Sequence, residues 1–335
     1  MELMPSLPEL SKQVISNSPE LEGNRVIIEK EILHFDILRC LQSRGYLGGL
    51  TFIGGTALRL CHGSTRYSED LDFDGGSDFS AENMAGIEDD LRSDLAKRYG
   101  HEIQVQPPKP RQLDADISVS TWRISVVTHP GRPDIPRQRI HLDIAGAPAR
   151  QAESLPVRDH YHRLLPNRGA LSIRVKTQES ILADKLVAFS SSIQRPSPRW
   201  RDLWDINWLS AAGVQVNSAL VTLRAADFEI SEIAKWITEA GKRTPVLMNT
   251  PHFRTQLSRF LDNATATETV HNLDWRAEAT KRIQSTFQSF RPVSTVELKR
   301  EDQSNSQDDT PQPSKSKATA SNRKTDNGNE PYDPF

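Results

Sequence analysis

The segment from Phe52 to Gly75, FIGGTALRLCHGSTRYSEDLDFDG, constrains the fold of this 335-residue chain more than any other stretch. Near its end, Asp70, Asp72 and Asp74 alternate with apolar residues. Successive side chains of a β-strand point to opposite faces, so a strand here places the three carboxylates on one face and the apolar side chains on the other. Like charges in a row repel each other unless a cation neutralises them. The pattern therefore predicts a strand with a metal site.

Carboxylates two residues apart suit Mg²⁺, which prefers oxygen ligands. Two other interpretations stay open. Asp-x-Asp-x-Asp-Gly also begins a calcium loop, but its twelfth position would be Ala81 rather than a glutamate, Glu82 comes one residue late, and the flanks do not read as two amphipathic helices. A solvated acidic turn is the other alternative.

A glycine pair, Gly54 and Gly55, follows a short apolar run and precedes residues 56–62, which have the composition of a helix. The first turn of a helix offers free N–H groups and the positive end of the helix dipole, and both favour phosphate. Taken alone, the pair also fits an ordinary strand-to-helix turn. It is not a P-loop, because no Gly-Lys-Ser/Thr follows at the required spacing.

The motifs GGTALR (54–59) and RYSEDLDF (66–73) occur in this order, joined by a short spacer. Together they resemble the signature of the AbiEii/AbiGii toxin family of nucleotidyltransferases. The family belongs to the polymerase-beta-like superfamily and acts in bacterial abortive-infection and toxin–antitoxin systems, including type IV systems. The resemblance implies an α+β fold, in which a mixed nucleotidyltransferase sheet flanked by helices precedes a mainly helical C-terminal domain.

Hydrophobic spacing gives a coarse map of the elements. Helices are expected over residues 24–44, 80–99, 177–189, 228–240 and 272–290, and strands over 118–127 and 139–145, whereas 146–174 reads as irregular. The tail beyond Lys299 has almost no large apolar residue and cannot offset its conformational entropy. The predicted parts are an N-terminal segment (1–23), a nucleotidyltransferase domain (24–150), a linker (151–176), a helical domain (177–298) and a disordered tail (299–335).

A further acid lies on the predicted strand over 139–145, where His141 and Asp143 alternate with apolar residues. A lone aspartate on a strand commonly faces solvent. The resemblance implies another role, because in polymerase-beta-like enzymes a third acid from a neighbouring strand completes the first two. Asp143 is the candidate to complete Asp70 and Asp72.

Two segments of the predicted helical domain extend the resemblance. ADKL (183–186) resembles a family segment whose lysine faces the nucleoside triphosphate, and this role is favoured for Lys185 because the segment occurs in the expected order. Extension of the lysine from an apolar stripe into solvent is the alternative. RDLWD (201–205) resembles a family segment of the form Arg-Asp-Leu-x-Asp. Asp202 or Asp205 would orient Lys185 or the substrate, with Asp205 preferred, and pairing with Arg199 or Arg201 is the alternative.

The implied reaction transfers a nucleoside monophosphate from an NTP to an RNA acceptor. The most favoured acceptor is the tRNA 3′ end, so that aminoacylation, translation and growth are inhibited. The catalytic set would be Asp70, Asp72, Asp143, Lys185 and Asp205; the nucleotide-binding set Gly54, Gly55, Thr56, Arg66, Ser68 and Asp202; and the ligands of Mg²⁺ or Mn²⁺ Asp70, Asp72 and Asp143. The alternatives are a nucleotide-binding regulatory protein without transfer activity, and transfer to a protein hydroxyl.

The net charge of −2 gives no overall basic field, so RNA must be bound by local patches such as Arg132, Arg137 and Arg139, or Arg195, Arg199 and Arg201. The resemblance also implies a cognate antitoxin. Cys40 and Cys61 lack metal-ligand spacing and are expected to be buried, reduced thiols. With no signal peptide and no apolar run of about 20 residues, a cytoplasmic protein without membrane contact is expected.

Overall fold

The computed structural model describes most of the chain and divides it into two units, residues 1–295 and 296–335. All of the structure below belongs to the first unit, and the predicted disordered tail lies outside the described residues. Those residues are 5–100, 102–109, 119–129, 131–132, 134–165, 168–195, 197–294 and 298.

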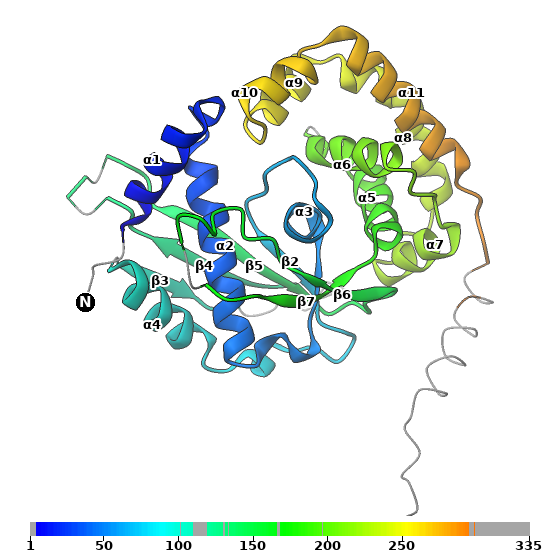
Figure 1. The fold of residues 1–335 in the computed structure, drawn as a ribbon. Helices are drawn as coiled ribbons and strands as arrows, with labels where there is room; N and C mark the ends of the chain where they lie inside the picture. The colour runs from blue at the N-terminus through cyan, green and yellow to red at the C-terminus, as the bar shows by residue number, and fades with distance from the viewer. Residues whose placement is uncertain are drawn as a thin grey trace, which may run out of the picture. The chain divides into compact units, whose positions relative to one another are not determined.

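A mixed β-sheet of seven strands, in the order β3-β4-β5-β2-β1-β7-β6, is the centre of the described structure (Figure 1). The pairs β2–β5 and β1–β7 are parallel, and the remaining pairs are antiparallel. The strands are β1 Thr51–Ile53, β2 Leu71–Asp74, β3 Ile103–Gln106, β4 Val119–Val126, β5 Gln138–Ala145, β6 Ala152–Pro156 and β7 Ser172–Lys176.

Strands β3, β4 and β5 bury one face and leave the other polar. On β4, Trp122, Ile124 and Val126 are buried, whereas the side chains between them are partly exposed. The helices α2 (Arg25–Ser43) and α4 (Ile87–Tyr99) pack against the buried face. This pattern is typical of antiparallel strands with one face on the core, and it leaves the opposite face for polar side chains.

The C-terminal part is helical, because α5 packs against α6, α7 and α8, and α11 packs against α6 and α8. The α+β prediction, a mixed sheet followed by a helical region, is confirmed. The remaining helices are α1 Leu7–Asn17, α3 Gly54–Ala57 with its π-helical continuation Leu58–His62, α5 Gln178–Ser192, α6 Trp200–Ala211, α7 Ser218–Asp227, α8 Ile233–Met248, α9 Pro251–Ser258, α10 Asn263–Glu268 and α11 Leu273–Ser289, with short 3₁₀ turns at Pro19–Leu21, Tyr46–Gly49 and Ala81–Met84.

The segment 151–176 differs most from expectation, because it contributes strands β6 and β7 rather than only irregular chain. Strand β6 lies at the edge of the sheet and has no buried residue, so it carries no hydrophobic alternation. The expected helix over 80–99 is also divided, into a 3₁₀ turn and α4. Gly86, with φ of +89°, lies between the two parts.

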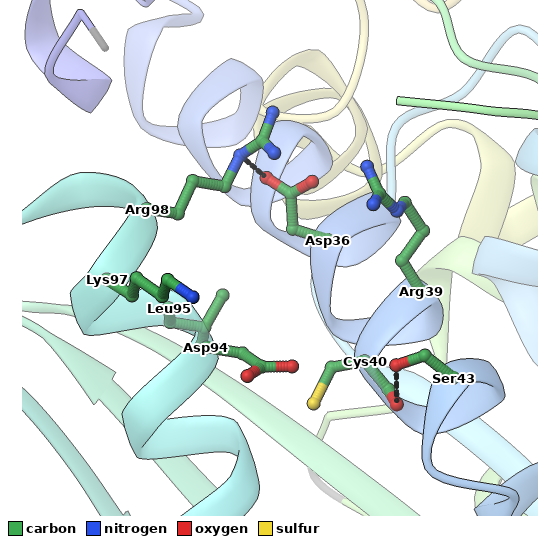
Figure 2. A pocket seen from close by; sticks show the side chains of 8 residues that line it. All are labelled: Asp36, Arg39, Cys40, Ser43, Asp94, Leu95, Lys97 and Arg98. Atoms are coloured by element: carbon green, nitrogen blue, oxygen red, sulfur yellow. Dashed lines mark hydrogen bonds and ion pairs between the residues drawn. The ribbon is translucent and has the colours of Figure 1, made fainter. Parts of the chain in front are cut away.

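A cavity of about 370 Å³ lies between α2 and α4 (Figure 2). Its wall includes Cys40 and Asp36, and Asp36 pairs with Arg98 Nε at 2.9 Å.

Burial raises the pKa of the Cys40 thiol to about 12, and it raises the pKa of the Cys61 thiol to the same value. Both cysteines are free and buried, as predicted. Among the described residues, no helix is long and apolar enough to cross a membrane.

Candidate active site

The glycine pair lies where β1 ends and α3 begins, and it makes room for two side chains of the site. Gly54 has φ of +80°, and a Cβ at this position would lie 2.5 Å from Asp72 Oδ2. A Cβ on Gly55 would collide with the guanidinium of Arg66 and would lie 3.0 Å from Ser68 Oγ. Only glycine allows these approaches. The pair predicted to bind phosphate therefore also leaves the space that Asp72 and Arg66 occupy.

Asp72 and Asp143 are brought together by the pairing of parallel strands. In the register of β2 with β5, the two residues are direct partners. Asp143 Oδ1 is buried and has no hydrogen-bond partner among the described residues. Within the described part of the chain, the Asp72 carboxylate makes no ion pair. Two adjacent carboxylates are therefore held without a counter-ion from the described residues in direct contact.

The surroundings of these two acids disfavour their ionised forms. Burial, together with the neighbouring Asp143 and Asp70, raises the pKa of Asp72 to about 6, although Lys185 and Arg199 act in the opposite direction. Burial also raises the pKa of Asp143, with Asp70 adding to the effect and Thr121 opposing it. Desolvation and like charge are the ordinary causes of such shifts. A cation bound between the two carboxylates would neutralise the like charge and offset the cost of burying the ionised forms.

Asp70 precedes β2 and is engaged differently. Its Oδ1 accepts a hydrogen bond of 3.0 Å from the backbone N–H of His141 and lies 3.2 Å from Nδ1 of the same residue. The hydroxyl of Thr56, which is buried, donates to the Asp70 backbone carbonyl. Thr56 thus fixes the turn before β2, while the second carboxylate oxygen of Asp70 has no partner among the described side chains.

Asp74, the third acid of the alternating motif, belongs to a buried ring of ion pairs. Lys176 Nζ lies 2.6 Å from Asp74 Oδ2 and 2.9 Å from Asp184 Oδ2. Arg224 closes the ring, with Nη1 at 3.1 Å from Asp74 and Nε at 3.0 Å from Asp184. The three acids therefore do not form one equivalent set, and Asp74 joins β2 to β7, α5 and α7.

Lys185 is held by both acids of the predicted RDLWD segment. Its Nζ lies 2.9 Å from Asp202 Oδ1 and 2.8 Å from Asp205 Oδ2. Asp205 also accepts two hydrogen bonds from Arg66, at 2.9 and 2.8 Å. Asp202 pairs with Arg199 as well, at 2.6 Å, so the helical pairing considered as an alternative is present too.

This network keeps its members charged although they are buried. Burial alone would lower the pKa of Lys185, but the Asp202 and Asp205 carboxylates outweigh burial and raise it. Burial opposes ionisation of Asp205 as well, yet Arg66 and Lys185 hold the pKa of this acid well below its ordinary value. Buried charges persist only when they are paired in this way. Lys185 thus presents a fixed positive charge.

A cavity of about 450 Å³ joins the two halves of the site, because it is lined both by Asp72 and by Lys185. Its wall carries several cations, and the side chain of one of them, Arg195, makes no ion pair with a described residue. The remaining lining residues are Ile53, Gly54, Asp184, Val187, Ala188, Ser191, Arg199, Arg224, Phe228 and Ile230.

Sequence reasoning missed Arg224, Phe228 and Ile230, which come from α7 and the segment after it. Their spacing in the sequence carries no signal for a site. Arg224 lies 4.6 Å from the centre of the Phe228 ring, so the pair forms one side of the cavity. The cavity wall therefore combines cationic side chains, among them Lys185 and Arg224, with apolar ones such as Phe228 and Ile230.

Among the described residues, no group of three or more His, Cys, Asp and Glu side chains is arranged as a metal site. Asp72 and Asp143 nevertheless fit a divalent cation. Asp143 Oδ1 is a buried acceptor without a donor in the described part of the chain, and both carboxylates have raised pKa values that a cation would reverse. Asp70 is a less ready ligand, because one of its oxygens is occupied by His141.

Comparisons with known proteins found a matching family model and similar solved structures. The model of a family described as nucleotidyl transferase AbiEii toxin, type IV TA system, matches residues 36–291. MenT4, a nucleotidyltransferase toxin from Mycobacterium tuberculosis H37Rv, has 15% sequence identity and a TM-score of 0.53, with 87% of this chain and 97% of that chain covered.

JHP933 from Helicobacter pylori has 19% identity and a TM-score of 0.45, with 84% of this chain and 96% of that chain covered. At such low identity, the likeness to MenT4 shows the fold alone. None of the curated proteins is significantly similar in sequence.

Proposed function

Because this chain belongs to the AbiEii family of nucleotidyltransferase toxins of type IV toxin–antitoxin systems, we propose that it transfers a nucleoside monophosphate from an NTP to the 3′ end of an RNA, most favourably a tRNA. One observation carries the proposal. Asp72 and Lys185 line a single cavity, although they come from a strand and a helix more than 100 residues apart, and Asp143 is paired with Asp72. Asp72, next to Asp143 in the strand register, thus shares a cavity of nucleotide size with the charged Lys185.

The cavity has the volume and chemistry for an NTP. Ligand pockets commonly measure about 300–1,000 Å³ and combine apolar walls with a few polar groups. Lys185, Arg195 and Arg199 supply positive charge for the triphosphate. Phe228 and Ile230 supply an apolar surface for the base or ribose. Arg195 can bind a phosphate without giving up an ion pair, because it makes none with a described residue.

Asp72 and Asp143, with the free oxygen of Asp70, would hold Mg²⁺ or Mn²⁺. When bound, the cation neutralises the acids and stabilises charge on the transferring phosphate. Gly54, which has no Cβ, leaves room for the Asp72 carboxylate at the start of α3. Gly55 leaves room for Ser68, and Thr56 donates a hydrogen bond to the Asp70 backbone carbonyl.

The chemistry of the acceptor depends on Asp143. Asp143 lies beside Asp72 in the strand register, and its carboxylate can accept the proton of the acceptor hydroxyl. The acceptor 3′-hydroxyl gives its proton to Asp143, and its oxygen forms a bond to the α-phosphorus. The bond between the α-phosphorus and the bridging oxygen breaks, and pyrophosphate leaves. Lys185 attracts the departing phosphates, and Asp202, Asp205 and Arg66 keep it in place.

Such a reaction at the tRNA 3′ end would block aminoacylation and so inhibit translation and growth, and a cognate antitoxin would restrain it. The test is incubation of the protein with labelled CTP, UTP, GTP or ATP, Mg²⁺ and total tRNA. Labelled tRNA is expected from the wild type and none from Asp72→Asn.

The two alternatives are separated by the same experiment. Label on protein instead of RNA would indicate transfer to a protein hydroxyl. Binding of NTP without label on any macromolecule, together with equal growth of cells that express wild type and Asp72→Asn, would indicate a binding protein without transfer activity. Either result contradicts the proposal.

A further inference from the structure

We propose that the polar face of β3, β4 and β5 binds the single-stranded 3′ end of the RNA acceptor. We call this surface the basic sheet face; its residues are Gln104, Gln106, Arg123, Ser125, Arg137, Arg139 and His141. The inference rests on the proposed function, because it takes the acceptor to be a polynucleotide. It goes further by naming the surface and the arginines that guide the acceptor to Asp143.

Strand register makes the basic sheet face continuous with the acids. Along β5, Arg139, His141 and Asp143 are spaced two residues apart, so they share one face at steps of about 6.7 Å. On β4, Arg123 pairs with His141, and Thr121 pairs with Asp143. A chain whose end lies at Asp143 would therefore pass His141 and Arg123 first, and then Arg139.

The same residues surround a hollow. The side chains of the basic sheet face, with Ile124, line a cavity of about 460 Å³. The helices α2 and α4 pack on the opposite, apolar face of these strands. The polar face is therefore accessible beside the candidate active site.

The charges of this surface are available for a polyanion. Neither Arg123 nor Arg139 makes an ion pair or a side-chain hydrogen bond with a described residue. Arg137 pairs with Glu102 at 3.3 Å, but both side chains are exposed, and such pairs contribute little. Arg132, by contrast, is engaged by Asp134 at 2.7 Å. Of the cluster Arg132, Arg137 and Arg139 singled out in the sequence, Arg139 is the member without a partner among the described residues.

The chemistry of the face favours RNA over a protein partner. Its side chains are arginine, histidine, glutamine and serine, which are the groups that contact phosphate and sugar oxygens. The cores of protein interfaces are apolar and rich in aromatic residues. The apolar lining residue Ile124 is buried, so the side chains that this face exposes are polar or charged. Affinity would thus come mainly from phosphate contacts and would depend on salt.

The experiment compares the full-length wild type with the double variant Arg123→Gln/Arg139→Gln. The matched control, Arg92→Gln/Lys281→Gln, also removes two positive charges, from the exposed faces of α4 and α11. The readouts are KM for a tRNA, NTP affinity measured without RNA, and binding of a short single-stranded RNA at several salt concentrations.

The double variant should raise KM for tRNA by about 10- to 100-fold, because two charge-assisted contacts are lost. The slope of log affinity against log salt should fall by about 1.4, since each contact to a single strand accounts for about 0.7. NTP affinity and the control variant should stay near wild type.

Three results would overturn the inference while leaving the proposed function intact: unchanged KM for tRNA in the double variant, an equal loss in the control, or a loss confined to NTP affinity. If the wild type labels no RNA at all, the proposed function itself fails. Label on protein with no effect of the double variant would assign the acceptor to another class and would reject this surface for RNA.

Discussion

Asp72 and Asp143 are direct partners on the adjacent parallel strands β2 and β5, and neither carboxylate makes an ion pair with a described residue. Two neighbouring acids without a counter-ion cost stability at neutral pH. Fold stability therefore does not explain their placement, whereas the cation proposed above does. The first two predictions follow from this pair.

The Asp72→Asn variant should be more stable than the wild type at pH 8. The pKa of Asp72 is raised from 3.8 to about 6, so the folded protein holds a proton that the unfolded chain has released. Wild-type stability therefore falls as pH rises from about 4 to 6, by up to about 3 kcal/mol, and does not recover above that window. The Asp72→Asn variant has no carboxyl group to titrate at this position, so its stability does not show this fall. Unfolding in urea at pH 4 and pH 8 measures it, and an equal difference at both values would contradict the prediction.

A divalent cation should distinguish Asp72 from Asp74. Mg²⁺ with a non-hydrolysable NTP should raise the melting temperature of the wild type and of Asp74→Asn, but not that of Asp72→Asn. Asp74→Asn should itself be destabilised by about 3–5 kcal/mol, because Lys176 and Arg224 lose a buried partner. Thermal shift measurements test both points. A response to Mg²⁺ that survives in Asp72→Asn and disappears in Asp74→Asn would reverse the assignment.

Asp205 should matter more for stability than Asp202. Asp205→Asn leaves Arg66 and Lys185 without a shared buried partner, so we expect a loss of about 3–5 kcal/mol. Asp202→Asn should cost less, because Lys185 keeps Asp205 and the Arg199 side chain is 54% exposed.

The pH dependence of stability gives a second test for Asp205. Because the folded pKa of Asp205 is depressed, its contribution to stability is present above the ordinary aspartate pKa of about 3.9 and is lost as pH falls below it. Urea unfolding across pH 3–7 should therefore show a smaller difference between wild type and Asp205→Asn at the acid end. A constant difference would count against this account.

The Gly54→Ala variant should lose transfer activity through its effect on Asp72. The new Cβ would meet Asp72 Oδ2 at 2.5 Å, and the positive φ adds backbone strain. Gly76→Ala is the matched control, because Gly76 has a similar φ of +86°, but a Cβ added there would meet no described atom within 4 Å. Both variants should lose about 1 kcal/mol or more in stability. Activity should fall in Gly54→Ala alone; an equal fall in both would attribute the effect to strain.

Much of the site was predictable, because its signals are local. The alternation from Asp70 to Asp74 predicts a strand, and the alternation around Asp143 predicts a second one. The repeated apolar spacing predicted α2, α5 and α11, within a few residues of their observed bounds. These features depend on the period of side chains along one element, which a sequence displays directly.

The partners of each acid were decided by tertiary structure. Asp72 and Asp74 carry the same alternation, yet one lines a cavity and the other is enclosed by Lys176 and Arg224, the latter 150 residues away. The choice of Asp205 as the residue that binds Arg66, 139 residues earlier, was likewise outside the reach of spacing rules. Sequence periodicity fixes which face of an element a side chain occupies; packing between distant elements determines what that face meets, because burial and ion pairing depend on neighbours that are remote in the chain.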